Sequence, residues 1–98
     1  MAYEIELTDE ARDDVKALRR TDQVVVLEAI ETQLRFEPNR KTRNRKRLRT
    51  NALAEWELRV GKFRVFYNVE EDTLVVSIEA IGFKIGSLLF IRNERSEL

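Results

Sequence analysis

The residues best suited to chemistry lie in two stretches of alternating apolar and polar residues. Alternation places Glu55, Glu57 and Arg59 on one side of the first stretch. Arg64 takes the polar side of the second stretch. Its planar guanidinium is well suited to binding phosphate with two hydrogen bonds. The alternative is an ion pair across the strands with Glu55 or Glu57, and the two roles are compatible if a ligand displaces the pair.

Glu55 and Glu57 are separated by roughly 7 Å along one face of a strand. Such a pair could serve in acid–base catalysis or bind a metal ion. A solvated polar strand face is the favoured interpretation, since no third ligand is evident. The chain contains no cysteine and no histidine, which excludes disulfides, thiolate metal sites and imidazole catalysis. We therefore expect no metal ion and no cofactor.

A basic segment at residues 39–49 is the strongest electrostatic signal. Seven of its eleven residues are basic and none is acidic, which leaves 11 basic against 18 acidic side chains elsewhere. Its basic residues are Arg40, Lys41, Arg43, Arg45, Lys46, Arg47 and Arg49. We expect an exposed loop that contacts nucleic acid. The alternatives are a solvated loop and a patch that pairs with an acidic protein partner.

The length of 98 residues predicts a single domain covering residues 1–98. The first residues have neither the basic nor the apolar segment of a secretory signal. No apolar run is longer than the four residues Val24–Leu27, far below the roughly 18 needed to span a membrane. The expected location is the cytoplasm, with no membrane partner.

The first half of the chain predicts one strand and two helices. Tyr3–Leu7 alternates as a half-buried strand does. A helix capped by Thr8 or Asp9 should follow and end near Arg20. A second helix, capped by Asp22, should end near Phe36, before Pro38. Its predicted buried stripe is Leu27, Ile30 and Leu34.

The second half predicts three strands, at residues 54–60, 63–69 and 73–81. Gly61 and Lys62 suit a type II′ turn between the first two. Trp56 and Tyr67 should face the core, and Phe66 should face outward, where it could stack on a base or be covered by a partner. A short strand at 87–91 and a frayed tail complete the chain. The expected fold is α+β, in the order β-α-α-β-β-β, with a helix hairpin on a curved, mainly antiparallel sheet.

Several strings of the sequence resemble the RelE/ParE family of toxins from type II toxin–antitoxin systems. The most specific reads ELRVGKFRVFY and is preceded by the basic Lys46 and Arg47. The strings that carry the resemblance are residues 3–18, Glu37–Pro38, residues 46–48, residues 57–67 and residues 81–84. Together they extend over about residues 3–90. The resemblance implies this same fold and an antitoxin as protein partner.

The resemblance also implies an activity, because RelE-like members cut messenger RNA on the ribosome without a metal ion. By position, Arg64 matches the arginine that stabilises the scissile phosphate. Lys84 lies where an arginine often follows the last strand, and Arg59 matches a recurrent arginine before the hairpin. A glutamate serves as base in some members, so Glu55 or Glu57 is the candidate here. The implied partners are therefore the ribosome and messenger RNA.

Three departures from RelE-like enzymes favour other activities. Those enzymes have lysines where this chain has Glu55 and Glu57, and often a tyrosine near Phe90. Other family nucleases use a histidine, which this chain lacks. The alternatives are a ParE-like toxin that inhibits DNA gyrase without cutting RNA, and a degenerate member that only binds an antitoxin.

Overall fold

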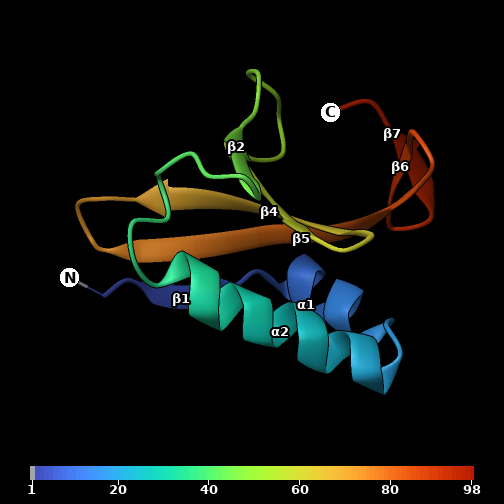
Figure 1. Ribbon diagram of the computed structural model, residues 1–98, viewed down its shortest axis with the longest axis horizontal. Coiled ribbons are helices and arrows are strands. Elements are labelled where there is room, and N and C mark those ends of the chain that lie inside the picture. Colours follow the sequence, from blue (N-terminus) through green and yellow to red (C-terminus); the bar gives the residue numbers. More distant parts are fainter. Residues whose placement is uncertain (1) are drawn as a thin grey trace.

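The computed structural model describes residues 2–98 and has two helices packed on one side of a seven-stranded sheet (Figure 1). The helices are α1 (Asp9–Lys16) and α2 (Arg20–Leu34). The strands are β1 (Glu4–Leu7), β2 (Arg45–Arg47), β3 (Trp56–Val60), β4 (Phe63–Glu70), β5 (Val75–Ile85), β6 (Leu88–Ile91) and β7 (Glu94–Ser96). Figure 1 shows β2 and the β6–β7 hairpin on the side away from the helices. No helix of this part of the chain is long and apolar enough to cross a membrane.

The sheet is antiparallel from β2 to β7, and β1 adds to it as the one parallel strand, beside β5. The predicted α+β fold is therefore confirmed, with β2 and β7 as additional strands. The strand expected at 73–81 extends further along the chain, past Gly82. It continues because Phe83 pairs with Phe63 on one side and with Phe90 on the other.

The turn between the helices comes earlier than the sequence predicted. α1 begins as expected, since the Thr8 hydroxyl accepts a hydrogen bond from the Ala11 backbone at 3.1 Å. It ends at Lys16, however, and Arg20 is already the first residue of α2. The side-chain amide of Gln23 donates to a backbone carbonyl of the turn at 2.9 Å, which stabilises this early reversal.

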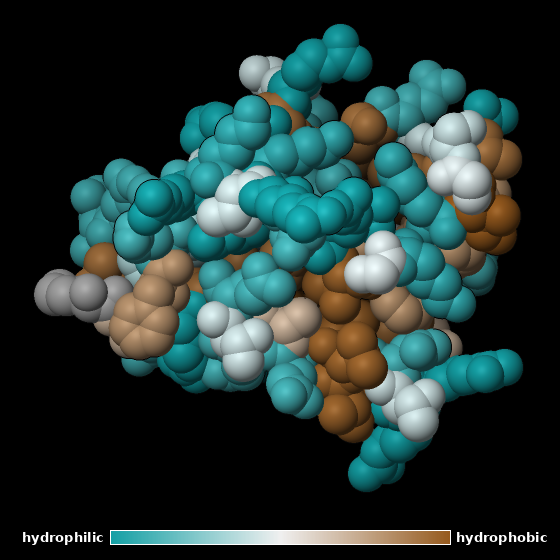
Figure 2. Space-filling model, viewed as in Figure 1, coloured by the Kyte–Doolittle hydropathy of each residue, from teal (hydrophilic) through white to brown (hydrophobic). Residues whose placement is uncertain are grey.

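The buried stripe of α2 differs from the predicted one. Val26, Ile30 and Leu34 repeat every four residues and face the sheet. Leu27 was expected among them but is 38% exposed, because it lies about 100° around the helix from Val26. The exposed large apolar residues of this helix are Val24, Val25 and Leu27. Figure 2 shows apolar atoms gathered over α2, so this helix is not polar on its outer side.

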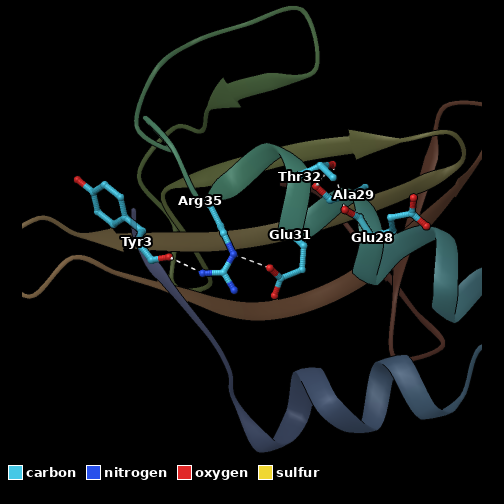
Figure 3. A network of polar contacts seen from close by, with 6 residues as sticks. All are labelled: Tyr3, Glu28, Ala29, Glu31, Thr32 and Arg35. Carbon is cyan, nitrogen blue, oxygen red and sulfur yellow. Dashed lines mark hydrogen bonds and ion pairs between the residues drawn. The ribbon is translucent and has the colours of Figure 1, made fainter. Parts of the chain in front are cut away.

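The end of α2 is joined to the start of β1 (Figure 3). The Tyr3 backbone N–H donates to the Arg35 carbonyl at 2.8 Å, and the Arg35 guanidinium donates to the Tyr3 carbonyl at 3.2 Å. Glu31, one turn earlier, forms an ion pair with the same guanidinium. These bonds end the helix at Leu34, two residues before the predicted Phe36.

Trp56 and Tyr67 lie in the main core, as predicted from their alternation. Their rings stack with centroids 6.2 Å apart, and both side chains are buried. The Tyr67 hydroxyl donates to the carbonyl of Pro38 at 2.8 Å. Burial raises the pKa of Tyr67 well above its ordinary value. Tyr67 therefore remains a neutral donor that connects the core to the start of the basic segment.

The basic segment was predicted to be a loop, and this is wrong for its middle part. Residues Arg45–Arg47 form β2, an edge strand paired with β3. The Arg59 backbone N–H also donates to the carbonyl of Asn44 at 2.7 Å and extends the pairing by one bond. Residue types did not predict this strand, because its stability comes from backbone pairing with β3 across an intervening loop and not from its own side chains.

The C-terminal tail, predicted to be frayed, forms β7 and pairs with β6. Arg92 and Asn93 both have positive φ, at 52° and 65°, as a type I′ hairpin turn requires. Arg92 forms an ion pair with Asp14 of α1 at 3.2 Å, and the Asp14 carboxylate also accepts the Ile81 N–H at 3.0 Å. Burial raises the pKa of Asp14, although that hydrogen bond and the Arg92 charge oppose the rise.

Candidate functional site

The sheet face away from the helices brings together basic residues from three strands. Arg59 of β3 and Arg64 of β4 are direct cross-strand partners, so their side chains leave the sheet on the same face. Lys46 of β2 stands directly opposite Glu57 in the same way. Like charges placed directly opposite destabilise a sheet unless an opposite charge lies nearby. This arrangement therefore favours the binding of an anion.

These side chains line a cavity of about 170 Å³. Its lining residues are Arg43, Asn44, Lys46, Glu57, Arg59, Arg64 and Lys84. We call this cavity the cationic pocket. Five of its residues are basic and only Glu57 is acidic, which gives the lining a formal charge of +4. Four of the five candidate catalytic residues, all except Glu55, thus lie together.

Arg64 is the most firmly held of the basic groups. Its Nη1 donates to the carbonyls of Gly61 at 2.8 Å and Phe63 at 2.9 Å. Its side chain is 11% exposed, so little water competes for the guanidinium. The hairpin turn supplies one of these carbonyls, and Gly61 has the positive φ of 58° that this turn needs. The Nε–H side of Arg64 is then available to a ligand.

Lys84 and Arg59 are positioned by backbone pairing at the same end of the hairpin. The Lys84 N–H donates to the Lys62 carbonyl at 2.8 Å and continues the β4–β5 ladder beyond its last paired residues. Arg59 is held through its backbone bond to Asn44. Asn44 is a pocket residue that sequence reasoning missed, because a single asparagine between two arginines carries no recognisable signal. The pocket thus depends on β2 as much as on the central strands.

Glu57 and Glu55 occupy different environments. The Glu57 side chain is 10% exposed, and its Oε2 lies 3.8 Å from Lys46 Nζ and 3.9 Å from Arg64 Nε. Glu55 precedes β3 and lies 3.9 Å from Arg47, outside the cationic pocket. It lines a separate cavity of about 520 Å³ beside Trp56. The expected pairing of Arg64 with a glutamate therefore involves Glu57, and the two carboxylates do not form one site.

The seven basic residues of the segment do not form one patch. Arg43 and Lys46 line the cationic pocket. Arg45 donates to the Glu37 carbonyl at 2.7 Å, and Arg40 forms an exposed ion pair with the Glu37 side chain. The others lie outside this pocket: Lys41 is exposed, Arg47 lies over the Trp56 ring, and Arg47 and Arg49 line two further cavities with Thr50. Only two of the seven thus contribute to the cationic pocket.

Phe66 faces away from the helices, as predicted, but it is not available to a base. Its side chain is fully buried in a second apolar cluster with Ala54, Ala80 and Leu89. The C-terminal hairpin passes close to the sheet here, since a Cβ added to Gly82 would lie 2.6 Å from the Phe90 carbonyl oxygen. The chain itself therefore covers Phe66, and the base-stacking interpretation is wrong.

Solved structures share this architecture. The chain is similar to the toxin–antitoxin complex RelBE2 from Mycobacterium tuberculosis, with 25% identity and a TM-score of 0.74 over 86% of this chain and all of that one. It is also similar to the archaeal RelE–RelB complex from Pyrococcus horikoshii OT3, with 20% identity and a TM-score of 0.69 over 89% of this chain and 99% of that one. The fold is thus that of the RelE class of toxins.

Residues 5–82 match the family model of the ParE toxin of type II toxin–antitoxin systems, parDE. This match spans most of the sequence, and the chain belongs to the RelE/ParE family of type II toxins. No curated protein sequence matches the chain. The family resemblance found in the sequence is thereby confirmed.

Proposed function

We propose that this toxin cuts messenger RNA on the ribosome, in the cytoplasm, and stops growth by doing so. The observation that carries the proposal is the cationic pocket, in which Arg59 and Arg64 face each other across two strands. Five basic groups around a small cavity suit a phosphate, whose oxygens gain negative charge as the attacking oxygen bonds to phosphorus. Arg64 is nearly buried and Lys84 is half-buried, so these two charges act more strongly than the same groups in water, whereas Arg43, Lys46 and Arg59 are exposed.

The chemistry needs a base, a proton donor and groups that stabilise negative charge around the scissile phosphate. The ribose 2′-OH attacks the adjacent phosphorus, a base takes the hydroxyl proton, and a proton is supplied to the leaving 5′ oxygen. Arg64, Arg59 and Lys84 would hold the phosphate and stabilise the charge of the pentavalent intermediate. Glu57 is the one carboxylate in the pocket and is the candidate base.

The basic segment would contact the RNA backbone outside the pocket. Its remaining basic residues are mostly exposed. Such contacts carry no sequence information but position the substrate and make binding dependent on salt. We propose an antitoxin as the protein partner, because both similar solved structures are complexes of a toxin with its antitoxin.

The second candidate is inhibition of DNA gyrase. The family model that matches is that of ParE toxins, which favours this activity. Glu57 also lies in the pocket where RelE-like enzymes have a lysine, and Phe90 has no hydroxyl to transfer a proton. A third candidate is a degenerate member that only binds an antitoxin.

Inducible expression in a bacterium distinguishes the three. Growth and the 5′ ends of transcripts would be followed for the wild type, for Arg64→Ala and for Arg12→Ala, an exposed arginine of α1. Loss of one charge-stabilising group should reduce cleavage roughly 100-fold. New cleavage sites in translated frames, lost only with Arg64→Ala, support the nuclease. Growth arrest with intact transcripts supports gyrase inhibition, and no arrest at verified expression supports the degenerate binder.

A further inference from the structure

The cationic pocket contains its own anion. Glu57 is the only acidic residue in the lining, and one oxygen of its carboxylate lies within 4 Å of two separate cations. The nitrogens of those cations, Lys46 Nζ and Arg64 Nε, come from the strands on either side of Glu57. A single oxygen between two cations is the position that a phosphate oxygen would take.

The Glu57 contacts are loose. At 3.8 Å and 3.9 Å both are longer than a hydrogen bond between nitrogen and oxygen, which is about 3.2 Å at most. Arg64 does not need Glu57 for its position, because two backbone carbonyls hold its Nη1. Removing the Glu57 charge should therefore change the potential of the pocket more than its geometry.

We propose that Glu57 is an internal counter-anion that competes with phosphate for the cationic pocket. In the free toxin it offsets the repulsion between the facing arginines, and a phosphate group must overcome its charge to enter. A lone phosphate then binds weakly, and substrate affinity depends on further contacts along the RNA. This inference rests on the proposed phosphate site, and it is independent of whether Glu57 also takes a proton.

The test is the binding of inorganic phosphate to the purified chain at fixed ionic strength and pH, measured by calorimetry or by the NMR shift of Arg64 Nε–H. Glu57→Gln keeps the shape and removes the charge. Its Kd for phosphate should fall about tenfold, a modest part of the repulsion expected between two like charges about 4 Å apart. Glu57→Asp keeps the charge and should stay within about twofold of the wild type.

Glu55→Gln is the matched control. Glu55 lies 3.9 Å from Arg47 of β2, but outside the cationic pocket. It should leave the Kd unchanged. Arg64→Ala should abolish binding in both the wild-type and the Glu57→Gln background. If Glu57→Gln does not fold alone, millimolar phosphate should restore its circular dichroism spectrum, because the ligand replaces the missing negative charge.

The outcomes separate the two proposals. Equal or weaker phosphate binding by a folded Glu57→Gln variant overturns the counter-anion alone, as does an unfolded variant that phosphate does not restore. Absence of binding in every variant overturns the phosphate site and, with it, the proposed function. Binding that survives Arg64→Ala places the anion elsewhere and overturns both.

Discussion

On the face of the sheet covered by α1 and α2, the side chains of β3, β4 and β5 meet the helices in one continuous apolar core. On the opposite face the same strands carry a small apolar cluster around Phe66 and, beside it, the cationic pocket. The first face gains its stability mainly from apolar burial, with the buried hydrogen bond from Tyr67 to Pro38 in addition. The second combines a smaller buried cluster with a pocket whose lining has a formal charge of +4.

The largest effect should come from removing the anchor of the small cluster. Phe66→Ala should lower the free energy of unfolding by about 3–5 kcal/mol, as for a fully buried aromatic ring of a main core. Chemical denaturation would measure it, with Phe36→Ala as control because that ring is 62% exposed. A loss below about 1 kcal/mol would mean that this cluster shields Phe66 from water but contributes little to the free energy of unfolding.

The next effect concerns the close approach of the C-terminal hairpin. Gly82→Ala places a methyl group against a backbone oxygen that cannot rotate away, so the hairpin must shift. We expect a loss of about 1–3 kcal/mol, measured by thermal unfolding. Gly86→Ala is the control, because nothing lies within 4 Å of a Cβ at that position. The positive φ of Gly86 adds some backbone strain to this control. A cost no larger than that of the control would contradict the tight approach.

The helix-covered face offers a sharper test of hydrogen bonding. Tyr67→Phe removes the hydroxyl that donates to the Pro38 carbonyl and leaves that buried oxygen without its donor. The expected loss is about 1–2 kcal/mol by chemical denaturation. Tyr3→Phe, at a half-buried tyrosine near the N-terminus, should change stability by less than about 0.5 kcal/mol. If Tyr67→Phe and Tyr3→Phe lowered stability equally, the hydrogen bond from Tyr67 to Pro38 would make no particular contribution to stability.

The smallest effect is a pH dependence at the junction of α1 and the C-terminal hairpin. The pKa of Asp14 is higher in the folded than in the unfolded state, so the folded state binds its proton more tightly. Burial of the charge then costs stability above the folded pKa, and this cost disappears as pH falls below the ordinary value of 3.8. The wild type should therefore gain stability relative to Asp14→Asn as the pH is lowered towards that value.

This dependence would be measured as the difference in unfolding free energy between the two proteins at several pH values. Asp72→Asn removes an exposed carboxylate that is not among the charges acting on Asp14, and it is the control, which should show no such trend. If the wild type instead lost stability relative to Asp14→Asn as the pH was lowered, the ion pair with Arg92 would outweigh the effect of burial on the pKa of Asp14.

Sequence patterns predicted the face on which a side chain lies but not what covers it. Alternation placed Arg64 and Phe66 correctly on one face, and the structure brings Arg59, Arg64, Lys84 and Glu57 together there. The same alternation could not reveal that the C-terminal hairpin, together with Leu53 and Ala54, covers Phe66, whereas Arg64 lines the cationic pocket. Coverage depends on tertiary contacts that no local pattern contains.

The failure to predict β2 and β7 has a related cause. β2 and β7 are three residues each, rich in charge, and neither shows an apolar period. Each is stabilised by backbone bonds to a neighbouring strand, and β7 also by a turn of Arg92 and Asn93 that lacks the usual glycine. Alternation placed Glu55 on the same face as Glu57, and the family resemblance made both candidates for the base. Glu55 precedes the start of β3, however, and lies outside the cationic pocket.

β2 also has a consequence for the behaviour of the molecule in a crowded solution. It is the last strand at one end of the sheet order, and all three of its residues are basic. An unpaired strand edge is a template for stacking copies of a chain into aggregates, and charged edge residues are a known defence. The arginines and lysine proposed to contact RNA would therefore also repel a second copy of β2 and keep this end of the sheet from polymerising.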